Sequence, residues 1–143
     1  MPESSAGRDE IVTEWSRDLV MYRMTRATET MEDARVLPNA GRWNACVNHL
    51  YYACFYVVSA LLVSHDLSSS KHTGVRSLFN QKYVKTGKIP KDLARIYNDL
   101  FERRQAGDCI DFVSFKKSQV LPWIPKAENL IQRIILLIEE EMV

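Results

Sequence analysis

The stretch NHLYYACFY, residues 48–56, decides the expected fold of this chain. It places three tyrosines, a phenylalanine, a histidine and an asparagine in nine positions. Apolar residues recur at helical spacing between residues 40 and 65, yet Tyr52 and Phe55 lie outside that stripe. A helix that is apolar on nearly all sides lies at the centre of a bundle. The stretch therefore predicts a central helix whose aromatic side chains either fill the core or line a polar pocket.

Helical spacing continues on both sides of this segment. Prolines and glycines interrupt it, at Pro38 and between Gly87 and Pro90, while Pro122 and Pro125 bend or restart the last segment. The expected helices span residues 9–36, 40–65, 71–84, 90–107 and 114–141. The expected fold is all-α, an antiparallel up-and-down bundle of four to five helices. Residues 1–8 are expected to form a disordered tail, and residues 9–143 a single domain.

Composition and charge exclude several broad classes of protein. The chain has 143 residues, 46% of them hydrophobic, and a formal net charge of +1, so nothing global indicates binding to nucleic acid or membrane. The first ten residues do not resemble a signal peptide, and no apolar run approaches the ~20 residues that span a bilayer. The three cysteines are odd in number and form no C-x-x-C pair, which favours free buried thiols. We expect a cytoplasmic protein that does not enter the membrane.

Residues 71–91, KHTGVRSLFNQKYVKTGKIPK, form the most strongly charged segment. The segment holds six lysine or arginine residues and no acidic residue. Cations attract phosphates, and Phe79 and Tyr83 could stack on nucleic-acid bases. The alternative is a solvated basic face whose two aromatic side chains point into the core.

Arg42 and His49 are seven residues apart and therefore share one helix face. A cation and an imidazole are the minimum for metal-free cleavage of RNA, because one stabilises phosphate charge and the other moves a proton. Their separation of about 10 Å along one helix is too long for a single phosphate, unless a second subunit contributes. The alternative is an ordinary helix in which His49 makes a structural hydrogen bond.

Arg104 and Asp108 are spaced four residues apart and can pair on one helix face. Near Asn48 and Tyr52 the pair would either fix the packing or present a guanidinium to an anion. The chain has no Gly-rich phosphate loop, no H-E-x-x-H or G-x-S-x-G motif and no Cys/His cluster with metal spacing. We therefore expect neither a metal site nor a cofactor.

Four segments in order resemble the prokaryotic HEPN domains. Residues 48–53 (NHLYYA) resemble the signature N-R-x-Y-Y-A, and residues 104–108 (RQAGD) resemble R-x-x-A-D-Y. Between them, residues 71–75 (KHTGV) and 83–89 (YVKTGKI) match in register. The resemblance covers roughly residues 11–140. It implies a helical bundle that forms a two-fold dimer through its central helices.

The same resemblance implies one of two kinds of function. Many members are metal-independent endoribonucleases, often toxins, and many others are non-catalytic partners of a minimal nucleotidyltransferase or bind nucleotides or RNA. The catalytic motif of the family is an arginine followed, after four to six residues, by a histidine. The corresponding positions after Arg104 are Cys109, Ile110 and Asp111, and His49 replaces the usual arginine of the first signature.

The resulting hypothesis is a dimeric nucleotide- or RNA-binding accessory module, working with a nucleotidyltransferase-type partner in a toxin–antitoxin-like system. Its expected binding residues are Asn48, His49, Tyr52, Lys71, His72, Arg104 and Asp108. The first alternative is a metal-independent endoribonuclease with Arg42, His49 or Arg104 as catalytic candidates. The second is a purely structural dimerisation domain.

Overall fold

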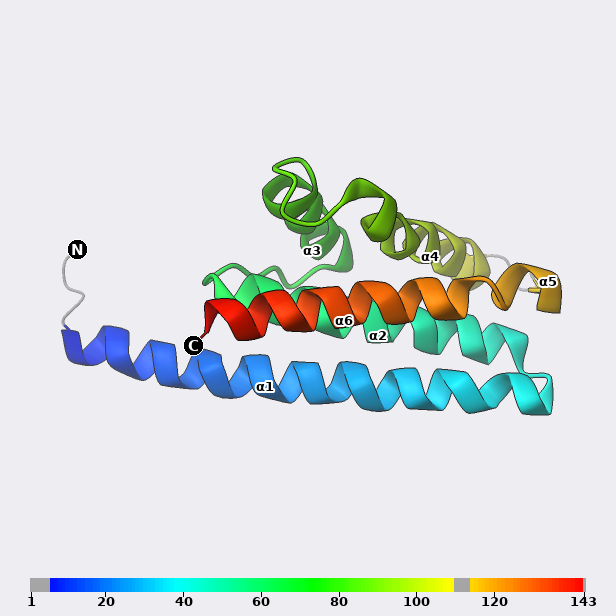
Figure 1. Ribbon diagram of the computed structural model, residues 1–143, viewed down its shortest axis with the longest axis horizontal. Helices are drawn as coiled ribbons and strands as arrows, with labels where there is room; N and C mark the ends of the chain where they lie inside the picture. The colour runs from blue at the N-terminus through cyan, green and yellow to red at the C-terminus, as the bar shows by residue number, and fades with distance from the viewer. Residues whose placement is uncertain (1–5, 110–113, 143) are drawn as a thin grey trace.

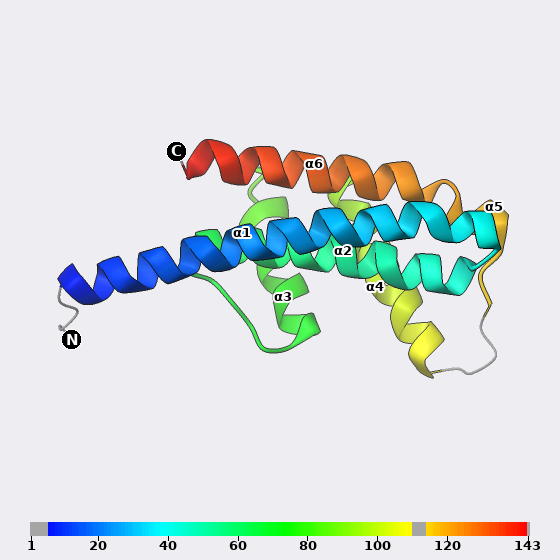
Figure 2. The same cartoon turned by 90° about the horizontal axis from the view of Figure 1, so that it is seen from below.

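The computed structural model describes the backbone of residues 6–109 and 114–142, and the side chains of residues 16–104 and 114–142. Three long helices run nearly along one axis: α1 (Ala6–Val36), α2 (Trp43–Ser64) and α6 (Trp123–Glu141). The short helix α3 (His72–Phe79) and the oblique helix α4 (Lys91–Cys109) cover the side of α2 that faces away from α1 (Figure 1). The view in Figure 2 shows both of them projecting from the long axis of the bundle. The described part of the chain contains no strand, and the expected all-α bundle is confirmed.

Helix α2 is the centre of the bundle, as the aromatic stretch predicts. It packs against α1, α3, α4 and α6. Residues 57–63 of its C-terminal half are all buried, whereas Asn48, Tyr52 and Tyr56 in its N-terminal half are exposed or only partly buried. Its thirteen buried residues are Cys46, Val47, Leu50, Tyr51, Ala53, Cys54, Val57, Val58, Ser59, Ala60, Leu61, Leu62 and Val63. By length and hydropathy α2 could cross a membrane, although the sequence suggested no such run. Because 72% of its apolar window is buried in the bundle, the helix serves here as the core.

The helix boundaries follow the positions of proline and glycine. The turn η1 (Leu37–Ala40) begins the link between α1 and α2, and Gly41 closes it with a left-handed φ of 68°. A side chain is strained at such a φ, so glycine is the residue that fits. The first helix begins at Ala6, three residues before the expected start. Only residues 1–5 of the expected tail therefore lie outside the described structure.

Two of the expected helices, the third and the fifth, differ from the sequence-based expectation. The segment 71–84 is α3 followed by one π-helical turn, η2 (Asn80–Val84). The segment 114–141 is divided into α5 (Lys117–Val120) and α6. Pro122 lies between the two helices, where its missing N–H interrupts the hydrogen bonding. Pro125 lies in the first turn of α6, where an N–H would have no helical partner, and is tolerated there.

Candidate functional site

The side chain of Arg104, on α4, lies against the aromatic rings of Tyr51 and Tyr52 on α2. Its Nη2 donates a hydrogen bond of 2.7 Å to the Tyr52 hydroxyl, and its Nε donates one of 3.3 Å to Asn48 Oδ1. The guanidinium carbon lies 4.9 Å from the centre of the Tyr52 ring and 5.2 Å from that of Tyr51. Asn48 and Tyr52 are one helical turn apart and so meet the same guanidinium. The structure thus brings together three residues that the sequence singled out and holds a cation in a fixed, half-buried position.

His72, the first residue of α3, places its imidazole beside the same aromatic rings of α2. Its Nδ1 lies 2.9 Å from the Tyr51 hydroxyl, and its ring stacks on Phe55 with centres 4.3 Å apart. Burial, followed by the charge of Arg104, lowers the pKa of His72 below 6.5. Burial raises the pKa of Tyr51 to about 12, so its hydroxyl stays protonated and can donate to Nδ1. At neutral pH the site therefore holds a neutral imidazole beside a permanent cation.

Tyr51 and Phe55 contribute to this site although the sequence did not assign them to it. They lie four residues apart and stack at 6.1 Å, so that they form one continuous face of α2 toward α3. The N-R-x-Y-Y-A signature could have indicated Tyr51, because in it Tyr51 directly precedes Tyr52. It was missed because spacing alone marks such aromatic residues as core.

The basic segment 71–91 can still attract phosphates through its cations, but its two aromatic side chains cannot stack on nucleic-acid bases. Phe79 is fully buried and Tyr83 is 2% exposed, so neither can stack on a base. This corrects the stacking interpretation in favour of a basic face over a packed core. Lys71, at the start of α3, is exposed beside His72. It can contribute long-range attraction of an anion to the Arg104 site.

A small pocket between α1 and α2 adjoins Arg104. It has a volume of about 140 Å³ and is lined by Arg26, Thr30, Asp33, Asn48, His49, Tyr52 and Tyr56. The residues from α1 were not foreseen. They are polar at spacings of four and three residues, a stripe that could have been noticed beside the apolar one.

His49 and Arg42 are not brought together as a catalytic pair. His49 Nδ1 lies 2.9 Å from the carbonyl oxygen of Ala45 on its own helix and donates to it, and the residue also lines the pocket. Arg42 is exposed at the N-cap of α2, and none of the described contacts joins it to His49. Asp108 lies outside the residues whose side chains are described, so its pairing with Arg104 stays a prediction.

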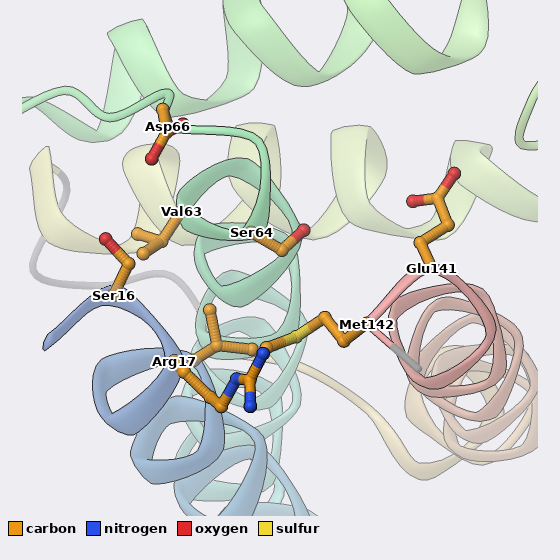
Figure 3. A pocket seen from close by; sticks show the side chains of 8 residues that line it. Ser16, Arg17, Val63, Ser64, Asp66, Glu141 and Met142 are labelled. Atoms are coloured by element: carbon orange, nitrogen blue, oxygen red, sulfur yellow. The ribbon is translucent and has the colours of Figure 1, made fainter. Parts of the chain in front are cut away.

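A second hollow lies at the other end of α2, where α1 and the end of α6 approach it (Figure 3). It measures about 280 Å³, and its lining includes Arg17 opposite Asp66 and Glu141. Glu141 also lies 3.0 Å from Nε2 of His65. The hollow contains charges of both signs and none of the predicted site residues. Among the described residues, no group of three or more His, Cys, Asp or Glu residues could hold a metal ion.

The fold and the Arg104 site define a helical domain with a polar site on its central helix. The chain matches the family model of the HEPN domain over residues 20–140, and it belongs to that family. The expected family membership is thereby confirmed.

Several known proteins are similar to this chain. A "UPF0332 protein" of Thermotoga maritima is 45% identical over 85% of this chain and 92% of its own length. Two proteins of Methanocaldococcus jannaschii, named "Putative toxin MJ0142" and "Putative toxin MJ0605", are 29% and 30% identical. They match 66% and 64% of this chain, and 64% and 69% of their own lengths.

Proposed function

We propose that this HEPN-family protein is a nucleotide- or RNA-binding accessory module whose site is built around Arg104. The observation that carries the proposal is the support of this guanidinium by Asn48 and Tyr52. Arginine binds phosphate through several N–H groups in a fixed plane, and support from neighbouring side chains lowers the entropy lost on binding. The exposed Lys71 would attract the anion toward the site.

Homodimerisation and a nucleotidyltransferase-type partner belong to the same proposal. They rest on the family resemblance, in which the central helices form a two-fold interface. The names of the two archaeal relatives support a toxin–antitoxin-like setting. Light scattering on the purified chain tests the dimer, and co-purification with a co-expressed nucleotidyltransferase tests the partner.

The binding proposal is tested with Arg104→Gln and a fluorescent single-stranded RNA. Arg95→Gln is the matched control, because Arg95 lies on the same helix with a 64% exposed side chain and pairs only weakly with Asp92 at 3.8 Å. We expect the affinity to fall at least tenfold in Arg104→Gln and to stay near the wild-type value in Arg95→Gln. Circular dichroism checks that both variants fold. Equal affinity in both variants, or no binding by the wild type to any nucleotide or RNA, contradicts the proposal and favours a structural domain.

A second candidate function is metal-independent cleavage of RNA. The observation that favours it is the neutral imidazole of His72 in contact with Tyr51, which also supports Arg104. In the tautomer whose Nδ1–H donates to the Tyr51 oxygen, Nε2 of the neutral imidazole can accept a proton while a nearby guanidinium stabilises phosphate charge. The purified protein would cleave RNA in EDTA, and His72→Ala would abolish cleavage while His49→Ala would not. The absence of cleavage by the wild type removes this candidate.

A further inference from the structure

The pocket between α1 and α2 holds a second arginine that the Arg104 site does not use. Arg26 of α1 has its guanidinium carbon 5.2 Å from the centre of the Tyr56 ring. Its hydrogen bond with the Tyr56 side chain raises the pKa of Arg26. The ion pair with Glu29 at 3.6 Å joins two exposed side chains and holds Arg26 only weakly. Arg26 therefore lies over a tyrosine ring of α2, as Arg104 does.

The two arginines lie over neighbouring rings of the same helix face. Arg104 lies over Tyr52 and Arg26 over Tyr56, and the centres of these two rings are 6.2 Å apart. Asn48, Tyr52 and Tyr56 recur every four residues, so α2 presents them in one row. The pocket lies along this row and includes Arg26. An extended ligand that reaches Arg104 can thus continue along α2 to a second cation.

The size of the pocket restricts what it can hold. Its volume of about 140 Å³ is below the range of ~300–1,000 Å³ typical of sites that enclose a small molecule. The pocket therefore does not enclose a whole nucleotide, and only part of a longer ligand would lie in it. The cation of Arg26 at this pocket favours a backbone phosphate over an uncharged base.

The acidic and hydroxyl groups in the pocket suit the sugar that accompanies a phosphate. The Asp33 carboxylate accepts hydrogen bonds only, and the Thr30 hydroxyl can donate or accept. A ribose 2′-hydroxyl is a donor that distinguishes RNA from DNA. A polyphosphate chain would bring several negative charges close to Asp33, whereas a single backbone phosphate on Arg26 brings only one.

We propose that this pocket is a second backbone subsite, in which Arg26 binds the phosphate adjacent to the one on Arg104 and Asp33 binds the ribose hydroxyl. The ligand of the whole site is then a single-stranded RNA, bound along its backbone, and not a mononucleotide. This inference rests on the proposed function of the Arg104 site.

The test compares Arg26→Gln with Arg17→Gln, which removes the same charge from the same helix near the hollow of Figure 3. Three probes are titrated: an RNA oligonucleotide, the DNA of the same sequence, and a nucleoside monophosphate. We expect Arg26→Gln to weaken RNA binding about tenfold, as loss of one charge-assisted phosphate contact does. The slope of log K against log salt should become less steep by about 0.7, the value for one phosphate of a single strand. Binding of the monophosphate should not change.

The possible outcomes separate the two proposals. No effect of Arg104→Gln on any probe overturns the proposed function. A loss in Arg104→Gln without a loss in Arg26→Gln overturns the second subsite alone, and so does an equal loss for RNA and monophosphate in Arg26→Gln. RNA should bind more tightly than DNA, and Asp33→Ala should narrow that difference. Equal binding of RNA and DNA by the wild type overturns the role of Asp33.

Discussion

Replacing Gly74 with alanine tests how α3 and its His72 are held against the rest of the protein. Gly74 is the third residue of α3 and faces the loop that precedes it. A methyl group at this position would lie 2.0 Å from Oγ of Ser69 and 2.8 Å from its Cβ. Ser69 Oγ accepts a hydrogen bond of 3.2 Å from the backbone N–H of Lys71, one residue before α3 begins. The glycine therefore permits the contact that places the start of α3.

The expected change in the free energy of unfolding combines one stabilising contribution with two destabilising ones. Alanine in place of glycine stabilises a helix by about 0.5–1 kcal/mol. Rotation of the Ser69 side chain can move Oγ away, but Cβ must still move from 2.8 Å to at least 3.4 Å, which requires a shift of the loop backbone. Overpacking of this kind costs ~1–3 kcal/mol, and a lost hydrogen bond ~0.5–1.5 kcal/mol. We expect Gly74→Ala to lower the free energy of unfolding by about 2 kcal/mol.

Urea denaturation of a double-mutant cycle measures this effect. Ser69→Gly removes both clashing atoms, so in that background alanine at position 74 should become neutral or stabilising. Ser69→Ala keeps Cβ and should rescue Gly74→Ala only in part. RNA binding should weaken in Gly74→Ala and recover in the double variant with Ser69→Gly, because His72 moves with α3. If Gly74→Ala stabilises the protein with Ser69 present, the close contact does not exist and the argument is refuted.

Three further predictions concern acid stability, thiol reactivity and the core. Because the pKa of His72 is lowered in the folded protein, stability is greatest above about pH 6.5 and is lost as the pH falls through the lowered pKa. In urea titrations at pH 7 and pH 5, His72→Gln should show a smaller loss than the wild type, and equal losses would contradict the assignment. Burial raises the pKa of Cys54 to about 12, so mass spectrometry after treatment with a thiol reagent at pH 8 should find it modified only when urea unfolds the protein; rapid native labelling would refute this. Leu50→Ala should cost ~2–5 kcal/mol and the matched Leu136→Ala less than ~0.5 kcal/mol, since the first side chain is fully buried and the second is 58% exposed; similar costs would contradict the core assignment.

Much of the helical fold was predictable because it depends on local signals. The spacing of apolar residues identified the long helices, and Pro38 ended the first of them where expected. Prolines in the last segment were expected either to bend the helix or to restart it, and at Pro122 the helix is divided and restarts. The π-helical turn after Phe79 was not predicted, since no local motif marks it; the turn contains Tyr83, whose side chain is buried in the core.

The candidate site was predictable only in part. Family signatures singled out Asn48, Tyr52 and Arg104, and these three do meet. The charge pattern of residues 71–91 left open whether Phe79 stacks on bases or lies in the core, and the burial of its side chain decides for the core. Sequence patterns also gave no indication of Arg26, because one charged residue on a long amphipathic helix is ordinary.

Local sequence patterns predicted the family, the all-α class and the central place of the stretch at residues 48–56. Periodicity and turn residues act over a few positions, so they can be read without knowing how the chain folds back on itself. The tertiary structure alone decided the neighbours of α2, because helices far apart in sequence meet there. Asn48 and Arg104 are 56 positions apart in the sequence, and the lining of the pocket also includes residues of α1. Which polar residues form one site depends on these long-range contacts, and no local pattern encodes them.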